Sequence, residues 1–198
     1  MIREFHLADF FTLGNAACGT ASIFGSMAFA RTGALSQYLL AAALLPVALV
    51  FDALDGRIAR WRQNHSSLGR ELDSLADIIS FGVAPAALAY AAGMSTWLDS
   101  AALIYFVVCG VSRLARYNVT AEELSGGGDK VRYFEGTPIP SSVLIVAWLG
   151  IAGLRGALGA DLDLGQWGAG LVALHPLVLV FAVSGSLMIS KTLHIPKI

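Results

Sequence analysis

Long apolar stretches, each followed by a short polar break, recur along the whole of this 198-residue chain. A helix needs about 20 apolar residues to cross the core of a bilayer. On that length the sequence predicts transmembrane helices near residues 10–30, 35–60, 68–92, 97–117, 139–157 and 167–190. Only 14% of the residues are charged, against about 25% in a typical soluble domain. We therefore predict an all-α, polytopic membrane helical bundle that forms one domain over residues 1–198.

The positively charged residues are distributed unevenly between the two sides of this predicted bundle. The opposite side carries only Arg31 and Arg155 if both termini face the cytoplasm. The other Lys and Arg residues then fall on the cytoplasmic side: Arg3, Arg57, Arg60, Arg62, Arg70, Arg113, Arg116, Lys130, Arg132, Lys191 and Lys197. The positive-inside rule therefore predicts six helices with both termini cytoplasmic. The longest polar stretch, 120–136, is expected to be a flexible surface loop on that side.

Four aspartates stand out in the second and third predicted helices. Asp52 and Asp55 are three residues apart, and Asp73 and Asp77 are four apart. Either spacing places two carboxylates on one face of a helix. Two such helices, packed antiparallel and joined by a polar turn near 64–67, would bring the four carboxylates together. This convergence would lie at the cytoplasmic ends of the helices.

Four acids at the edge of a membrane need a compensating charge, because a charged side chain at a helix centre costs about 2.5–3.5 kcal/mol on insertion scales. Hard divalent cations prefer oxygen ligands, and carboxylates suit Mg²⁺ or Mn²⁺. Two adjacent metals stabilise both the attacking and the leaving oxygen of a phosphoryl transfer. We predict a metal site here. The simpler alternative, interfacial acids balanced by nearby arginines, explains one aspartate better than four at these spacings.

Small residues and one arginine flank the acids. Gly56 removes a side chain next to Asp55, so that a ligand can approach the backbone. Ala59 and Gly69 keep the two facing helix surfaces narrow. Arg60 is a candidate for binding diphosphate oxygens, since a guanidinium group matches phosphate geometry.

Written with its gaps, the whole pattern is Asp52-x2-Asp55-Gly56-x2-Ala59-Arg60-x8-Gly69-x3-Asp73-x3-Asp77. It resembles the signature of the CDP-alcohol phosphotransferase family at every fixed position and in both gaps. The resemblance implies a membrane enzyme with a six-helix core, commonly a homodimer. Such an enzyme uses two divalent metals to transfer a phosphatidyl-type group from a CDP-lipid to an alcohol.

The resemblance also implies a role for each residue of the pattern. Asp52, Asp55 and Asp73 would bind one metal, and Asp73 and Asp77 would share the second. Asp77 would in addition be the catalytic base for the acceptor hydroxyl. The residues implied to line the CDP-lipid nucleotide site are Gly56, Ala59, Arg60 and Gly69.

Three further stretches are similar to the phosphatidylserine synthase branch of that family: FTLGNAACG at 11–19, SFGVAPA at 80–86, and SRLARYN at 112–118 with FEGTPIPS at 134–141. With the signature they span nearly the whole chain, whereas 161–175 matches nothing. They imply L-serine as acceptor and CDP-diacylglycerol or CDP-archaeol as donor. The sequence does not choose between those two lipids.

Several polar residues in these stretches are candidates for the substrate sites. Arg113 and Arg116 lie three apart and would suit a lipid phosphate or the carboxylate of serine, although interfacial arginines explain either one alone equally well. Thr137 precedes Pro138 in a segment that is either one wall of the acceptor pocket, which we favour, or a rigid entry to the next helix. Thr12 and Asn15, three apart in the first helix, would recognise cytosine of the CDP-lipid or form a helix–helix hydrogen bond.

The sequence as a whole predicts a serine phosphatidyltransferase in the cell membrane, surrounded by membrane lipids, with its active site facing the cytoplasm and no nucleic-acid partner. Two alternatives stay open: the same reaction with glycerol phosphate or inositol phosphate, and a metal-ion transporter. A transporter would favour acids at the bilayer midplane and a repeated half, and no second copy is present in the sequence. The four histidines do not cluster in sequence and are assigned no metal.

Overall fold

Helices make up most of the computed structural model, which describes residues 7–62, 67–125, 133–168, 173–190 and 194–196. The long helices are α1 (Leu7–Thr32), α2 (Leu35–Arg62), α3 (Ser67–Asp77), α4 (Ala84–Ala92), α5 (Trp97–Ser125), α6 (Ser142–Leu154) and α7 (Val178–Ile189). Shorter elements are the π-helix η2 (Ile78–Val83), the 3-10 helices η3 (Ile139–Ser141) and η4 (Gly159–Asp161), and strands β1 (Tyr133–Glu135) and β2 (His194–Pro196).

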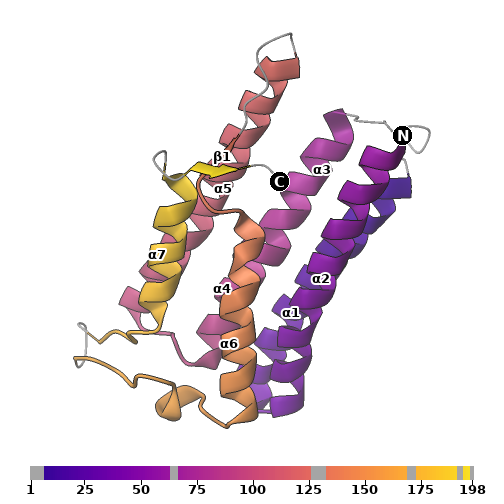
Figure 1. The fold of residues 1–198 in the computed structure, drawn as a ribbon. Coiled ribbons are helices and arrows are strands. Elements are labelled where there is room, and N and C mark those ends of the chain that lie inside the picture. The colour runs from indigo at the N-terminus through magenta and orange to yellow at the C-terminus, as the bar shows by residue number, and fades with distance from the viewer. Residues whose placement is uncertain (1–6, 63–66, 126–132, 169–172, 191–193, 197–198) are drawn as a thin grey trace.

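The helices stand side by side as a bundle (Figure 1). Within the described residues, three segments are long and apolar enough to cross a membrane: Leu35–Ile58, Leu68–Ala92 and Trp97–Val119. The second of these consists of α3, η2 and α4, which follow one another without a break from Ser67 to Ala92 and are together called the rod below. Helices α6 and α7 are apolar but shorter. The predicted all-α membrane bundle is confirmed, with the three-residue strands as a minor addition.

Helices α1 and α2 form a tight hairpin because small residues let their backbones approach. Gly33, with φ of +69°, makes the turn between them in a conformation that glycine adopts without strain. A Cβ on Gly25 would lie 3.0 Å from the Cβ of Ala41. The Ser22 hydroxyl donates a hydrogen bond of 2.8 Å to the carbonyl of the same alanine. Such close packing replaces the hydrophobic effect that is missing between helices in lipid.

On the other side of the bundle, α5 packs against α7. The rings of Phe106 and Phe181 meet edge to face, with centroids 5.2 Å apart, and both are fully buried. Gly185 makes room for this contact, since a Cβ there would lie 3.2 Å from the Cα of Phe106. Helix α7 is therefore fixed to α5 along its length.

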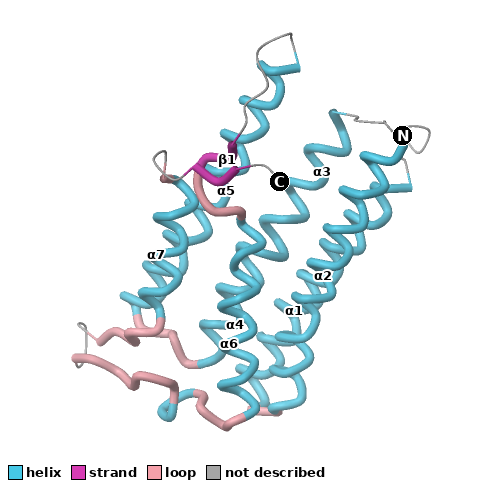
Figure 2. Tube along the Cα trace, viewed as in Figure 1, coloured by secondary structure: helices cyan, strands magenta, loops and turns pink. Residues whose placement is uncertain are grey.

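The two ends of the bundle differ in what they carry. The end of α2, the start of α3 and the end of α7 lie together at one end (Figure 1). At this end β1 pairs antiparallel with β2, and Phe134 lies opposite Ile195. The loops that join α6 to α7 lie at the opposite end (Figure 2). The chain thus keeps the aspartate-bearing helix ends apart from its longest described loop.

Two helix boundaries differ from the prediction. The helix predicted over 167–190 begins only at Val178, because Pro176 restricts the preceding residue to extended conformations and Trp167 pairs with Leu174 in an isolated bridge. The helix predicted over 97–117 continues to Ser125. The predicted loop at 120–136 is therefore helical at its start and forms β1 near its end, and its three consecutive glycines lie outside the described residues.

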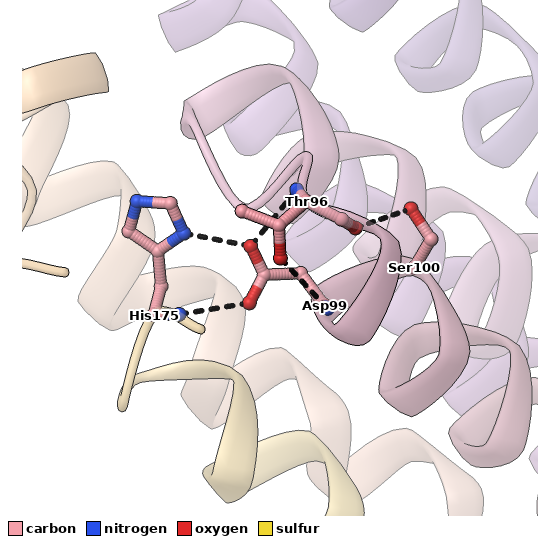
Figure 3. Close-up of polar contacts among 4 residues, drawn as sticks. All are labelled: Thr96, Asp99, Ser100 and His175. Atoms are coloured by element: carbon pink, nitrogen blue, oxygen red, sulfur yellow. Dashed lines mark hydrogen bonds and ion pairs between the residues drawn. The ribbon is translucent and has the colours of Figure 1, made fainter. Parts of the chain in front are cut away.

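A buried polar contact joins the loop before α7 to the start of α5 (Figure 3). It lies at the end of the bundle where the loops connect α6 to α7 (Figure 2). The Asp99 carboxylate accepts hydrogen bonds from the His175 backbone N–H at 2.9 Å and from the Thr96 backbone N–H at 3.1 Å. Its Oδ2 also lies 2.6 Å from Nδ1 of His175. The Asp99 N–H bonds back to the Thr96 hydroxyl, which completes a capping box for α5.

Replacing His175 with Ala is expected to lower the stability of the protein without changing its catalytic rate. The change removes a buried hydrogen bond to a charged group, which contributes about 1.5–3 kcal/mol. Thermal unfolding in detergent measures the effect. The control is Arg155→Ala, which breaks an exposed ion pair with Asp163 in the neighbouring loop and should cost about 0.2–1 kcal/mol. Equal melting temperatures for the two variants would contradict the structural importance of the Asp99–His175 contact.

Candidate active site

The aspartates of α2 and α3 converge, as their spacing predicts. One carboxylate oxygen from each of Asp52, Asp55 and Asp73 lies within 4.8 Å of the others. Asp77 is one helical turn beyond Asp73 and interacts electrostatically with Asp52 and Asp73. Asp55 and Asp77 are both buried, with 6% and 7% of their surface exposed. The site is therefore a partly enclosed cluster of carboxylates between two helices.

This cluster fits a divalent cation. Several like charges so close together repel one another, and burial at a membrane helix end weakens the screening by water. Oδ1 of Asp73 is buried and has no hydrogen-bond partner among the described residues. An oxygen atom in that state is suited to a hard cation, which takes carboxylate oxygens as ligands. The donor set and this unpaired oxygen together make Asp52, Asp55 and Asp73 a candidate metal site.

Helix α1 supplies hydrogen bonds to two of the acids. The Thr12 hydroxyl donates to Oδ2 of Asp55 at 2.7 Å. The Asn15 side-chain amide donates from Nδ2 to Oδ1 of Asp77 at 3.2 Å. Both α1 residues are buried. Of the two sequence alternatives for this pair, the structure contains the helix–helix hydrogen bonds.

The π-helix η2 begins directly after Asp77 and contacts two neighbouring helices. The Ser80 hydroxyl donates to the backbone carbonyl of Asn15 at 2.9 Å. The Ser142 hydroxyl of α6 donates to the backbone carbonyl of Phe81 at 2.8 Å. Short π-helical turns are rare and often occur at functional sites. Here the turn places Asp77 at a point where the rod is bonded to both α1 and α6.

Arg113 and Arg116 lie on α5 but differ in what they contact. Arg113 is partly buried, interacts electrostatically with Asp77, and its Nε has no hydrogen-bond partner among the described residues. Arg116 donates from Nη1 toward the carbonyl of Ile189, at 3.5 Å, at the end of α7. Carbonyls at a helix C-terminus attract cations. Of these two α5 arginines, Arg113 is therefore the one that interacts with the acid cluster.

Thr137 lies just before η3, and its backbone N–H donates to the carbonyl of Leu187 at 3.2 Å. Its hydroxyl oxygen is buried without a hydrogen-bond partner in the described part of the chain. Ile139, which follows, is fully buried between Gly110 of α5 and Gly82 of η2. The segment thus runs past the rod that carries Asp77, with one polar atom left unpaired.

The predicted nucleotide-site residues lie on the same two helices as the acids. Gly56 follows Asp55, and a Cβ built on it would meet no atom within 4 Å in the described part of the chain. Gly69 lies on α3, one turn before Asp73. Ala59 and Arg60 belong to the last turn of α2, and their side chains lie outside the described part of the structure. Among the described residues, the space beside Gly56 is open, so that no described side chain covers the α2 backbone there.

Comparison with known proteins adds an independent observation to this geometry. The family model described as CDP-alcohol phosphatidyltransferase matches residues 5–185. The chain belongs to this family. The matched region includes all four aspartates, the polar residues of α1, and the α5 arginines.

Relatives of this CDP-alcohol phosphatidyltransferase bear names that specify an acceptor. The CDP-diacylglycerol–serine O-phosphatidyltransferase of Saccharomyces cerevisiae is 41% identical over 100% of this chain and 72% of its own length. The enzyme of the same name from Mycobacterium tuberculosis is 36% identical over 66% of this chain, which spans only 44% of that relative. The archaetidylserine synthase of Methanothermobacter thermautotrophicus is 36% identical over 78% of this chain and 61% of its own length.

Two features of this family member's site were not singled out from the sequence. Asp9, buried in the first turn of α1, interacts electrostatically with Asp55. Asn118 of α5 donates to the Ser74 hydroxyl of α3 at 3.0 Å, and so links α5 to the helix of the acids. Asp9 is three residues before Thr12, and this spacing places the two residues on the same face of a helix. The spacing was therefore the signal in the sequence that could have identified Asp9. Asn118 ends the quoted SRLARYN stretch, but its partner is 44 residues away.

Proposed function

We propose that this chain transfers a phosphatidyl-type group from a CDP-lipid to L-serine and releases CMP. The observation that carries the proposal is the convergence of Asp52, Asp55 and Asp73 beside Asp77 in a chain of this family. The choice of serine is supported by relatives that are named for it. Their lipid donors, diacylglycerol-based in one name and archaeol-based in the other, are both candidates here.

The acid cluster is proposed to hold two divalent cations, Mg²⁺ or Mn²⁺. Asp52, Asp55 and Asp73 would bind one, and Asp73 and Asp77 the second. When bound, such ions neutralise charge that develops on phosphoryl oxygens during transfer. Oδ1 of Asp73 has no hydrogen-bond partner among the described residues, which supports assigning this residue to both ions, because an ionised carboxylate offers two oxygen ligands.

Asp77 is proposed to be the base. It would accept the proton of the serine hydroxyl, whose oxygen forms a bond to the lipid-side phosphorus. The bond between that phosphorus and the bridging oxygen of the diphosphate breaks, and CMP leaves with the bond's electrons. The amide of Asn15, 3.2 Å from Asp77, supports this assignment because it fixes the carboxylate in one orientation. A base must be held within hydrogen-bond reach of its proton to be effective.

The acceptor is proposed to bind on the α5 side, where Arg113, Arg116 and Thr137 lie. Serine is a zwitterion at neutral pH, and a guanidinium group pairs well with its carboxylate. The Nε of Arg113 and the hydroxyl of Thr137 are both buried without a hydrogen-bond partner in the described part of the chain, which supports this location. Arg113 also lies close enough to Asp77 for the two charges to interact, which puts the proposed carboxylate partner near the proposed base.

The nucleotide is proposed to lie along Gly56, Ala59, Arg60 and Gly69. The Gly56→Ala variant tests this placement. Because a Cβ at Gly56 meets no atom within 4 Å among the described residues, the fold should tolerate alanine and gain about 0.5–1 kcal/mol of helix stability. The methyl group would instead overlap the nucleotide, at a cost of about 1–3 kcal/mol in binding. We expect a raised KM for CDP-lipid with an undiminished melting temperature. An unchanged KM would place the nucleotide elsewhere.

We also propose how the molecule sits in the cell. The end that carries the acids would face the cytoplasm of a cell membrane, since Arg57, Arg70 and Arg113 are near it while Arg31 and Arg155 end α1 and α6 at the other side. The chain would act as one domain and as a homodimer within the membrane lipids. Experiments on inverted vesicles would test the orientation in the membrane, and chemical crosslinking would test the homodimer.

The experiment that tests the function is CMP release from CDP-diacylglycerol by the purified protein. L-serine, glycerol phosphate and inositol phosphate are supplied in parallel reactions, with Mn²⁺ or Mg²⁺ in each. The proposal expects release that depends on serine and on the metal. Release that depends on a phosphorylated alcohol instead would keep the reaction class and overturn the acceptor. Metal uptake into liposomes without any CMP release would overturn the assignment as an enzyme and favour a metal-ion transporter.

A further inference from the structure

Helix α1 has no acid in the converging cluster, yet its polar face contacts acids of both other helices. Thr12 bonds to Asp55 of α2, and Asn15 bonds to Asp77 at the end of α3. The two α1 residues are three apart and therefore share one face. Asn15 is fully buried and Thr12 is 4% exposed. One helix thus touches both halves of the site from a single side.

These contacts fix the orientation of the carboxylates. An ionised carboxylate only accepts hydrogen bonds, so each donor from α1 occupies one lone pair of Asp55 or Asp77. The 2.7 Å distance from the Thr12 hydroxyl to Asp55 is typical of a strong, charge-assisted bond. Each bond therefore restricts how its carboxylate can rotate. Groups that orient ligands in this way contribute strongly to metal affinity in known sites.

Helix α1 is itself fixed at the same height. The Ser80 hydroxyl of η2 bonds to the backbone carbonyl of Asn15 at 2.9 Å. One turn further, Gly19 lies so close to Ser80 that any Cβ on it would overlap that residue. At Gly14, a Cβ would lie 3.3 Å from the ring of Phe51 on α2. The register of α1 against both acid-bearing helices is therefore set within two turns of Asn15.

We infer that Thr12 and Asn15 are positioning residues that set the relative placement of Asp55 and Asp77. This inference rests on the proposed function, which gives those two aspartates their tasks. The competing role is recognition of the cytosine ring. The side-chain oxygen Oδ1 of Asn15 would be a suitable acceptor for it, because this atom is buried and has no partner among the described residues. The two roles differ in what the loss of each side chain does.

The first test measures metal binding without any substrate. Mn²⁺ is titrated into the purified protein and followed by electron paramagnetic resonance. Thr12→Val should weaken Mn²⁺ binding about tenfold or more, as loss of an orienting hydrogen bond does elsewhere. Thr12→Ser restores the hydroxyl and should restore the affinity. The matched control is Thr20→Val on the same helix, where the lost hydroxyl donates to the backbone carbonyl of Ala16 and, within the described residues, to no acid.

The second test separates positioning from base recognition. At saturating Mn²⁺, Asn15→Leu should lower kcat about tenfold or more while the KM for CDP-diacylglycerol stays near that of the wild type. The preference for CDP-diacylglycerol over UDP-diacylglycerol should also stay. Ser22→Ala, which removes a buried α1–α2 hydrogen bond away from the acids, is the control for packing. Should Asn15→Leu not fold, Asn15→Gln keeps the amide, displaces it from Asp77, and carries the same expectation.

Each outcome decides the inference. Unchanged Mn²⁺ affinity in Thr12→Val would overturn it for Thr12. A raised KM with loss of the cytidine preference in the Asn15 variants would overturn it in favour of base recognition. If the wild-type protein showed no serine-dependent CMP release, the proposed function would be wrong. The inference on Thr12 would still be tested, because the Mn²⁺ titrations of Thr12→Val, Thr12→Ser and Thr20→Val need no turnover.

Discussion

Replacing Asp77 with Asn is expected to lower the rate of CMP release about 10²–10⁴-fold, the contribution that a positioned general base makes. The amide has nearly the same shape as the carboxylate and its oxygen can still accept the hydrogen bond from Asn15, which is 3.2 Å from Asp77. The local packing at the start of η2 should therefore persist. What is lost is the ability to take a proton from the acceptor hydroxyl, together with the charge of one of the two carboxylates proposed to hold the second cation.

The Asp77→Asn variant should still bind the CDP-lipid, because the nucleotide is proposed to lie along α2 and the start of α3. Single-turnover CMP release and equilibrium binding of CDP-diacylglycerol measure the two properties separately. Glu71→Gln is the matched control: it changes an exposed acid of the same helix, outside the acid cluster, to an amide whose oxygen can still accept the hydrogen bond from Asn118 at 3.4 Å. Retained activity in Asp77→Asn would show that Asp77 is not the base. Loss of CDP-lipid binding would instead show that Asp77 contributes to binding the substrate.

The helices were predictable because a bilayer imposes a minimum length on apolar segments. The rod Leu68–Ala92 and the helix from Trp97 both appear as continuous runs in the sequence. The start of α7 was not predicted correctly, since the apolar residues before Val178 read like the helix itself. There, Pro176 and the Trp167–Leu174 bridge decide the backbone conformation. Hydropathy reports which residues favour lipid, and the conformation of short loops depends on other constraints.

The site was predictable where it depends on spacing within one helix. The pairs at 52 and 55 and at 73 and 77 needed only helical geometry and an antiparallel packing of two helices. The partners of these acids were less predictable. Thr12 and Asp55 are 43 residues apart, and Asn15 and Asp77 are 62 apart. Which hydroxyl faces which carboxylate depends on the register of α1, and small residues such as Gly19 set that register only once the helices are packed.

The same limit explains why the sequence assigned nothing to His175. Its partner Asp99 is 76 residues away, at the start of a different helix. A local signal did exist, because Thr96 and Asp99 have the spacing of a capping box at a helix start. That signal predicts the cap of α5 but does not predict that a distant histidine completes it. Long-range polar contacts of this kind become visible only in the folded chain.

Replacing Arg113 with Ala is expected to raise the KM for serine by about 30-fold or more, since losing one partner of a desolvated charge pair costs at least about 2 kcal/mol. The KM for CDP-diacylglycerol should change little. Arg113 is singled out because its Nε is buried and unpaired among the described residues while its charge faces Asp77. Arg113→Lys keeps the charge but not the planar fork, so that it should recover only part of the affinity.

Arg116→Ala is the matched control, because it removes the same side chain one helical turn away. Its guanidinium group reaches the carbonyl of Ile189, so we expect a lower melting temperature and a smaller change in the KM for serine. A larger change in Arg116→Ala than in Arg113→Ala would assign the serine carboxylate to Arg116. If neither variant altered the KM for serine, both arginines would be interfacial charges that follow the positive-inside rule. The carboxylate would then have to be bound by groups other than these two, and Thr137 would be the next residue to replace.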